Sequence, residues 1–219
     1  MIKAAQFQEY FERYKELTLI VLLIIFHTVG VIGIALPEYR ASFLALSFFN
    51  LSLSFVLLIL GRNEFSIKFW YYIIFTFFVG MAVEWIGVHT GLMFGDYYYG
   101  ENLGYKWYGV PVIIGINWVM LTIISSSVVS YITKIPKLLK ILLSAILMLI
   151  LDLLIEPFAI VSDYWYWAGD IPVSNFVWWF IIALFLQFVW FQFKLAEKNK
   201  VGLVLYFIQI LFFTILNLV

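Results

Sequence analysis

Seven long runs of apolar residues, separated by short polar segments, make up most of this 219-residue chain. The hydrocarbon core of a bilayer is ~30 Å thick, and a helix crosses it in about 20 residues. Every backbone polar group in lipid must be satisfied within the fold, and the strict alternation of a membrane barrel is missing. The pattern therefore predicts an all-α integral membrane protein with seven transmembrane helices, at residues 17–36, 41–60, 69–95, 110–132, 141–161, 173–193 and 201–219.

The Lys and Arg residues are concentrated in every second connection of this arrangement. Eleven of the thirteen lie in the N-terminal segment or after the second, fourth and sixth predicted helices, whereas Arg40 and Lys106 lie on the other side. Cytoplasmic loops of membrane proteins carry the excess of basic residues. We therefore expect a multi-pass protein of the cell (inner) membrane, with its N-terminus in the cytoplasm and its C-terminus outside.

The first sixteen residues differ in character from the rest of the chain. Residues 1–16 mix Lys, Arg and Glu with Phe and Tyr, which is typical of an amphipathic helix on a membrane surface. They have no apolar stretch followed by a small-residue cleavage site, so we expect no removable signal peptide. The prediction is a cytoplasmic N-terminal amphipathic segment (1–16) and a single seven-helix transmembrane domain (17–219).

The overall composition excludes several functional classes. The chain is 65% hydrophobic and only 12% charged, whereas soluble domains contain about 25% charged residues. The formal net charge is zero, which gives no reason to expect a nucleic-acid partner. Cysteine is absent, and this excludes disulfides, thiolate nucleophiles and iron–sulfur ligation by the chain itself.

Two stretches of the sequence share one design. Residues 84–118 and 152–179 each start with carboxylates inside an apolar run, pass through a loop rich in Tyr, Trp and Gly, and reach a proline at the start of the next predicted helix. Proline is well tolerated at a helix start. Because the third and fifth predicted helices run in the same direction, helices 3–4 and 5–6 are expected to form two parallel hairpins that carry the functional site.

Three carboxylates lie inside the predicted helices: Glu84, Asp152 and Glu156. A charge at the bilayer centre costs ~2.5–3.5 kcal/mol on insertion scales, so such residues usually face the bundle interior and serve a function. With a rise of about 1.5 Å per residue, Glu84 and Glu156 reach similar depths in the outer half of the membrane. Asp152 lies one turn deeper on the face of Glu156. We predict that the three line one lipid-accessible slot, and hydrogen bonding between helices is the alternative role.

Other polar residues in the predicted helices are candidates for positioning. The chain has two histidines, His27 and His89, without the paired spacing of zinc or di-iron sites. We therefore expect no metal site. Asn117 and Asn175 follow the two helix-opening prolines, and each either orients water or a carboxyl group, or forms hydrogen bonds between helices.

Aromatic residues reach 21% of the chain and gather at the outer ends of helices 3 to 6. Interfacial belts of Trp and Tyr explain only part of this surplus, since the inner side has fewer. An aromatic face attracts a cation by ~2 kcal/mol or more when the site is desolvated. Aromatic rings beside buried acids thus suit a carbocation, and they suit a long polyene equally well.

These residues resemble two signatures of the membrane carotenoid-biosynthesis family that includes carotenoid 1,2-hydratases and bisanhydrobacterioruberin hydratases. Together the two signatures cover under a third of the chain, in the expected order. The first is carried by Glu84, Gly87, Thr90-Gly91, Phe94-Gly95, Tyr97, Tyr99, Leu103-Gly104, Gly109-Val110-Pro111 and Trp118. The second is carried by Asp152, Glu156-Pro157, Ala159, Trp165, Trp167, Pro172, Asn175-Phe176 and Trp178.

The resemblance implies addition of water to the terminal C=C of a linear carotenoid end group, by acid catalysis and without a cofactor. Glu156 or Asp152 would protonate the alkene, and the other carboxylate or Glu84 would accept a proton from water. The expected partners are a carotenoid or other polyene lipid, water, the bilayer and neighbouring enzymes of carotenoid synthesis. The residues expected to contact the substrate or its water are His89, Phe94, Tyr97, Tyr99, Asn117, Trp118, Trp165, Trp167, Asn175 and Trp178.

Two other functions remain open from the sequence. A carotenoid cyclase or isomerase begins with the same protonation and differs only in its product. A proton-coupled transporter also uses acids within the membrane. A retinal protein is excluded, because the seventh predicted helix (201–219) contains no lysine for a Schiff base.

Overall fold

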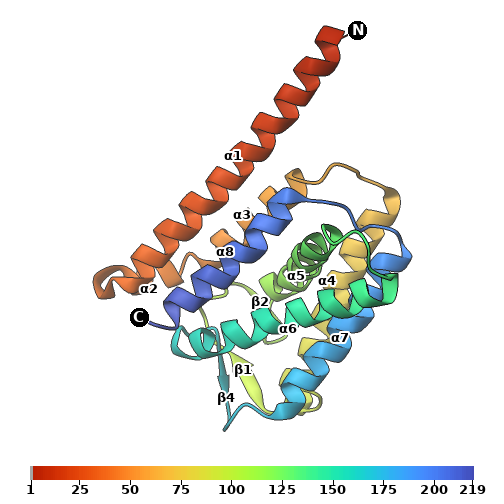
Figure 1. The fold of residues 1–219 in the computed structure, drawn as a ribbon. Coiled ribbons are helices and arrows are strands. Elements are labelled where there is room, and N and C mark those ends of the chain that lie inside the picture. The colour runs from red at the N-terminus through yellow and green to blue at the C-terminus, as the bar shows by residue number, and fades with distance from the viewer. Residues whose placement is uncertain (1) are drawn as a thin grey trace.

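The computed structural model describes residues 2–219, with side chains from Tyr14 onward, and consists almost entirely of helices (Figure 1). The expected all-α membrane fold is confirmed, with four very short strands in the connections. The helices are α1 (Ile2–Ala35), α2 (Pro37–Leu44), α3 (Ser47–Leu60), α4 (Ile67–Thr90), α5 (Val112–Ser130), α6 (Lys137–Val161), α7 (Val173–Gln192) and α8 (Lys200–Leu216). The strands are β1 (Tyr97–Tyr99), β2 (Lys106–Trp107), β3 (Val110–Pro111) and β4 (Trp165–Trp167).

Five of the described helices are long and apolar enough to cross a membrane: α1 over Tyr14–Ala35, α4, α5, α6 and α7. The prediction of one continuous helix at 41–60 is wrong, because α2 and α3 meet at a bend of 61°. At the break the Ser47 hydroxyl donates a hydrogen bond to the Leu44 carbonyl (2.6 Å), and such local bonds compete with the helical ladder. Taken as one broken span, the bent pair brings the total to six, and α8 is a shorter apolar helix, so the count of seven stays a prediction.

Helix α5 lies at the centre of the bundle, where it packs against α3, α4, α6, α7 and α8. Most of its residues are buried, as expected for a helix that is apolar on all sides. Its Trp118 lies against α4 because position 80 is a glycine. A Cβ atom there would be 2.6 Å from Trp118 Cδ1. The close approach of the two helices brings Trp118 next to Glu84, one turn along α4.

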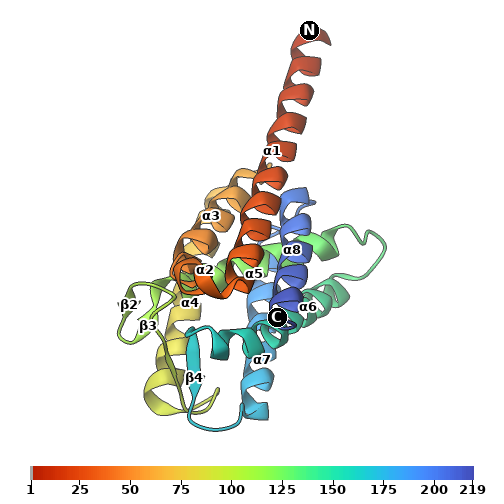
Figure 2. The same cartoon turned by 90° about the vertical axis from the view of Figure 1, so that its left-hand side faces the viewer.

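The two expected hairpins are present, since α4 packs against α5 and α6 against α7. The pairing of their loops with each other was not predicted. Strand β1 pairs antiparallel with β4, with Tyr97 opposite Trp167 and Tyr99 opposite Trp165. Figure 2 shows this ladder at the lower end of the molecule. It ties the first hairpin to the second.

Helix α1 runs without a break from Ile2 to Ala35, so it joins residues 2–16 to the first span, and the domain boundary after residue 16 stays a prediction. The side chains of residues 1–13 lie outside the described part of the chain. The amphipathic character of this segment and its place against the membrane therefore stay predictions.

The two ends of the bundle differ in their loops. The basic connections after α3, α5 and α7 lie toward the upper right in Figure 1, and the β1–β4 ladder lies at the opposite end. We expect the basic end to face the cytoplasm, by the charge bias of membrane proteins. A phosphatase that works only outside the cytoplasm, fused after Val219, should then be active. An inactive fusion, with a cytoplasmic reporter active at the same point, would reverse this orientation.

Candidate functional site

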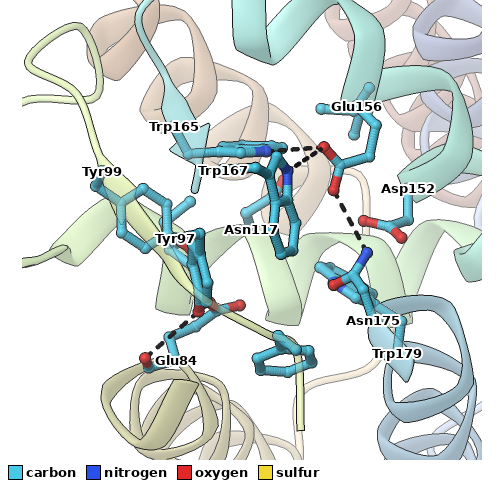
Figure 3. Close-up of a pocket in the computed structure, with 13 residues that line it drawn as sticks. Glu84, Tyr97, Tyr99, Asn117, Asp152, Glu156, Trp165, Trp167, Asn175 and Trp179 are labelled. Atoms are coloured by element: carbon cyan, nitrogen blue, oxygen red, sulfur yellow. Dashed lines mark hydrogen bonds between the residues drawn. The ribbon is translucent and has the colours of Figure 1, made fainter. Parts of the chain in front are cut away.

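A small cavity lies between the two hairpins, beside the β1–β4 ladder (Figure 3). Its volume is about 40 Å³. A single water needs about 10–15 Å³ on this measure, so the cavity is large enough for water. All three predicted carboxylates line it, as the depth argument anticipated. The lining residues are Glu84, Phe94, Tyr97, Tyr99, Ile114, Asn117, Asp152, Ile155, Glu156, Trp165, Trp167, Asn175 and Trp179.

The Glu84 carboxylate accepts three hydrogen bonds from neutral donors. Its Oε2 accepts from the hydroxyls of Tyr97 (2.6 Å) and Tyr99 (2.8 Å), and its Oε1 accepts from Trp118 Nε1 (3.1 Å). The side chain is almost fully buried. Hydrogen bonds to the charged form of a buried acid favour that form. The three donors therefore stabilise Glu84 as a carboxylate.

The two tyrosines that contact Glu84 stay protonated. Burial raises the pKa of the Tyr97 and Tyr99 hydroxyls above the usual range, and the neighbouring Glu84 carboxylate raises the pKa of each further. A phenol with such a raised pKa keeps its proton across the physiological range. Both side chains are thus permanent hydrogen-bond donors to Glu84.

Glu156 is also surrounded by donors, and these come from the other hairpin. Its Oε2 accepts from the indole nitrogens of Trp165 (2.8 Å) and Trp167 (3.2 Å). Its Oε1 accepts a longer bond from the Asn175 amide (3.4 Å). Like Glu84, Glu156 is held by three neutral donors and carries no basic partner among the described residues.

The strand ladder explains how four of these donors reach two carboxylates on different helices. Side chains alternate between the two faces of a strand, so Tyr97, Tyr99, Trp165 and Trp167 share the face toward the cavity. Tyr98 lies on the outer face, where it stacks on its cross-strand partner at 5.2 Å. An isolated two-stranded ribbon is marginal, and the bonds to the buried carboxylates support it.

Asp152 differs from the other two acids because no described residue forms a hydrogen bond with its carboxyl group. Its Oδ2 is enclosed without a partner, and the residue is 3% exposed. In Figure 3 the carboxyl group lies next to Asn175 and one helical turn from Glu156. An ionised carboxylate that is buried with neither a donor nor a counter-charge is strongly unfavourable. The environment therefore favours the neutral acid, which can donate a proton.

Asn117 supplies an amide that also has no partner. It lines the cavity from α5 and forms no side-chain hydrogen bond with the described residues. An amide offers two donors and an acceptor. Asn117 is therefore free to bind a water molecule or a substrate group inside the cavity, whereas the Asn175 amide is engaged with Glu156.

Ten of the thirteen predicted site residues line the cavity, and Trp118, His89 and Trp178 do not. Trp118 lies one layer behind, where it donates to Glu84 and stacks on Trp179 with ring centroids 3.9 Å apart. His89 is exposed, and its Nδ1 lies 2.9 Å from the Trp85 carbonyl. Trp178 is 37% exposed, on the side of α7 away from the cavity. The expectation that these three contact a ligand in the cavity finds no support in this geometry.

Three lining residues were missed by the sequence argument: Ile114, Ile155 and Trp179. Helical spacing would have found Trp179, because it lies four residues after Asn175 and therefore on the same helix face. Trp178 is rotated by about 100° from it, the step of a helix with 3.6 residues per turn. Ile114 and Ile155 have no distinguishing feature among the many apolar residues of their helices.

No group of three His, Asp or Glu residues within the described part of the chain is close enough to hold a metal ion. Each oxygen of Glu84 and Glu156 already accepts at least one hydrogen bond from an N–H or O–H group. These donors point hydrogen atoms at the positions that a cation would need. The donors hold the Glu84 and Glu156 carboxylates in place, and the cavity that these carboxylates line with Asp152 suits proton transfer.

We expect Tyr97→Phe to weaken the fold through Glu84. The change removes the shortest bond to the Glu84 carboxylate (2.6 Å) and leaves Oε2 with Tyr99 alone. Loss of one partner from a buried polar group typically costs about 1–3 kcal/mol. Thermal unfolding in detergent should show a lower midpoint. Tyr98→Phe, on the outer face, is the matched control and should unfold like the wild type. Equal midpoints for both variants would contradict the role of Tyr97.

Comparison with known proteins adds one match. A family model described as "carotenoid biosynthesis protein" matches residues 42–219, which include both hairpins and the strand ladder. No curated protein and no solved structure gives a significant match.

Proposed function

Because the chain belongs to the carotenoid biosynthesis protein family, as its two signatures led us to expect, we propose that this multi-pass membrane protein hydrates the terminal C=C of a linear carotenoid by acid catalysis. One observation carries the proposal. Three carboxyl groups surround a cavity that is large enough for water. Glu84 and Glu156 each accept three hydrogen bonds from neutral donors, whereas Asp152 accepts none from the described residues. Such a contrast in environment separates an acid from a base in many enzymes.

Asp152 is the proton donor in this proposal. Its carboxyl group delivers a proton to the less substituted carbon of the terminal alkene, and the adjacent carbon becomes a tertiary cation. The environment of Asp152 favours the neutral acid before this step, for the reasons given above. Glu156, which lies one helical turn after Asp152 on α6, is then close to the new charge.

The cation would be stabilised by the groups already fixed around the cavity. Glu84 and Glu156 supply negative charge, and the rings of Trp165, Trp167 and Trp179 supply aromatic faces. Preorganised charges in a site without bulk water are worth much more than the same charges in solution. Aromatic faces add cation–π attraction and cannot react with the cation as a water molecule would.

Water completes the reaction. A molecule held by the Asn117 amide attacks the tertiary carbon, and its proton passes to Glu156 and returns to the ionised Asp152. One alkene and one water give one tertiary alcohol, and both carboxyl groups end in their starting forms. No redox change takes place at any step, so the proposed reaction needs neither an oxidant nor a reductant.

The cavity must open before the substrate end group can enter. Pockets for small molecules usually have volumes of about 300–1,000 Å³, whereas this one has about 40 Å³. The wall formed by the ladder and the stacked Trp118–Trp179 pair is held by side-chain contacts. We therefore expect some of these side chains to move when the polyene binds.

Expression in a host that makes lycopene tests the proposal. We expect a new pigment that is heavier than lycopene by one water for each modified end, as measured by mass spectrometry. A pigment of unchanged mass with a new ring or altered double bonds would instead indicate a cyclase or isomerase. Unaltered lycopene, with the protein present in the membrane, would contradict a role on this substrate.

A further inference from the structure

A second cavity lies on the other side of the bundle, between α1, the α2–α3 bend and α8. These elements form the layer on the left of Figure 1. Its volume is about 300 Å³, several times that of the cavity between the hairpins. Tyr164 lies between the two sites, since it lines the second cavity and directly precedes Trp165, which donates to Glu156. The hydration proposal makes no use of this second cavity.

Five polar side chains line this otherwise apolar space. Ser47 and Tyr164 form a hydrogen bond with each other (2.6 Å), and the other three are His27, Asn50 and Gln209. The amides of Asn50 and Gln209 form no hydrogen bond with the described residues, and the Oδ1 and Oε1 atoms are enclosed. Gln209 is only 4% exposed. His27 uses Nδ1 for the Leu23 carbonyl (2.8 Å), which leaves Nε2 as an acceptor in the neutral ring.

Buried polar groups without partners are rare, and each calls for an explanation. Here two buried amide oxygens, Asn50 Oδ1 and Gln209 Oε1, lack partners and adjoin the same cavity, which the His27 ring lines from a third helix. Amides and imidazole offer both donors and acceptors. A hydroxyl group, which also donates and accepts, is complementary to them.

The rest of the lining defines the body of the ligand. No Lys, Arg, Asp or Glu is among the residues around this cavity, so an ionic headgroup would be buried without a partner. A second apolar groove of about 550 Å³ runs between α1 and α8 and shares His27 and Phe212 with the cavity. The two spaces together form an elongated apolar site with a polar patch inside.

We propose that this site binds a neutral linear isoprenoid lipid by its terminal hydroxyl group. The hydroxyl group bonds to Asn50 and Gln209, and the chain lies along the α1–α8 groove. A carotenoid with a hydroxylated end belongs to this class, and its identification as the occupant rests on the proposed function. The cavity would then hold an end that has already been hydrated, one protein layer away from the cavity that hydrates it.

The experiment compares two probes, lycopene and monohydroxylated lycopene, on the Asp152→Asn protein in lipid nanodiscs, where conversion is expected to be about 10²–10⁴-fold slower. Titration followed by polyene absorbance gives the affinity and the number of sites. We expect a site that prefers the hydroxylated probe, and loss of this preference when Asn50→Leu and Gln209→Leu are added. Two hydrogen bonds of ordinary strength correspond to about a tenfold difference in affinity.

The unfolding midpoint of the double variant shows whether a change in binding comes from a change in folding. Replacing unpartnered buried amides by leucine should leave the unfolding midpoint equal or higher, because no hydrogen bond within the protein is lost. Gln192→Leu at the far end of α7 makes the same chemical change on an exposed side chain and should keep the preference. Equal affinity of both probes for the parent protein, or an unchanged preference in the double variant, would overturn the proposal. Wild-type protein that binds as expected but does not hydrate lycopene would overturn the proposed function alone.

Discussion

Asp152→Asn is expected to remove most of the activity and leave the protein folded. Asparagine has nearly the same shape and stays neutral, so it keeps the packing of the neutral acid but has no acidic proton. A positioned acid or base contributes about 10²–10⁴-fold to a rate, and we expect a loss of turnover of this size. The unfolding midpoint should change little, because no described residue bonds to the Asp152 carboxyl group.

Asp170→Asn is the matched control for this variant. Asp170 lies exposed in the loop between β4 and α7, so the same chemical change there should leave turnover at the wild-type level. Product formation per molecule of folded protein, in membranes supplied with lycopene, is the measurement. If the Asp152 variant hydrated lycopene at the rate of the Asp170 variant, Asp152 would not be the proton donor.

Glu156→Gln is expected to lower turnover by about 10²–10³-fold, the range seen when one preorganised group that stabilises transition-state charge is removed. The glutamine oxygen can still accept from Trp165 and Trp167. The amide nitrogen of this glutamine then faces the side chain of Asn175. The Asn175 amide group can rotate so that its oxygen accepts a hydrogen bond from this nitrogen. The hydrogen bonds are thus retained, and the loss reports the missing negative charge beside the cation together with the missing acceptor for the proton of water.

Glu84→Gln is a useful comparison for Glu156→Gln because the proposed mechanism gives Glu84 a charge to supply but no proton to accept. The donors on the two oxygens of Glu84 are hydroxyl and indole groups. Glutamine at position 84 can keep its oxygen toward the Trp118 indole and turn its amide nitrogen toward the tyrosine hydroxyls, which accept as well as donate, so the fold should be kept while turnover falls. Unchanged turnover in Glu156→Gln, measured with bound carotenoid confirmed by absorbance, would remove Glu156 from the mechanism.

The membrane fold and the meeting of the three acids could be predicted from the sequence for simple reasons. The span of a helix in lipid is fixed by the bilayer thickness, so apolar runs of the right length could be placed along the chain. Glu84 and Glu156 lie equally far from the starts of two predicted helices that run in the same direction, which placed both at one depth. Asp152 lies four residues before Glu156 and therefore on the same helix face. The bend at Ser47 was missed because residues 41–60 contain no Pro or Gly to mark it, and the local bond from the Ser47 hydroxyl to the Leu44 carbonyl leaves no sign in the apolar pattern.

The different environments of the acids could not be read from the sequence. The donors to Glu84 and Glu156 come from a ladder between residues 97–99 and 165–167. Each strand has three residues, far too few for a period to be visible, and the pairing joins segments that are distant in the chain. Without that ladder, nothing distinguishes Asp152 from Glu156 as the acid. His89 and Trp178 were misplaced because their residue types suited the chemistry, whereas their helix faces point elsewhere.

Turnover in heavy water tests the central claim most directly. The terminal alkene is protonated by an exchangeable carboxyl group and then attacked by water. The product should therefore be a tertiary alcohol with one deuterium on the carbon adjacent to the carbon that bears the new hydroxyl group. That deuterium should resist exchange when the product returns to ordinary water, and Asp152→Asn should yield little of the labelled alcohol. An alcohol without carbon-bound deuterium, or a deuterated pigment that has gained no water, would contradict acid-catalysed hydration by this site.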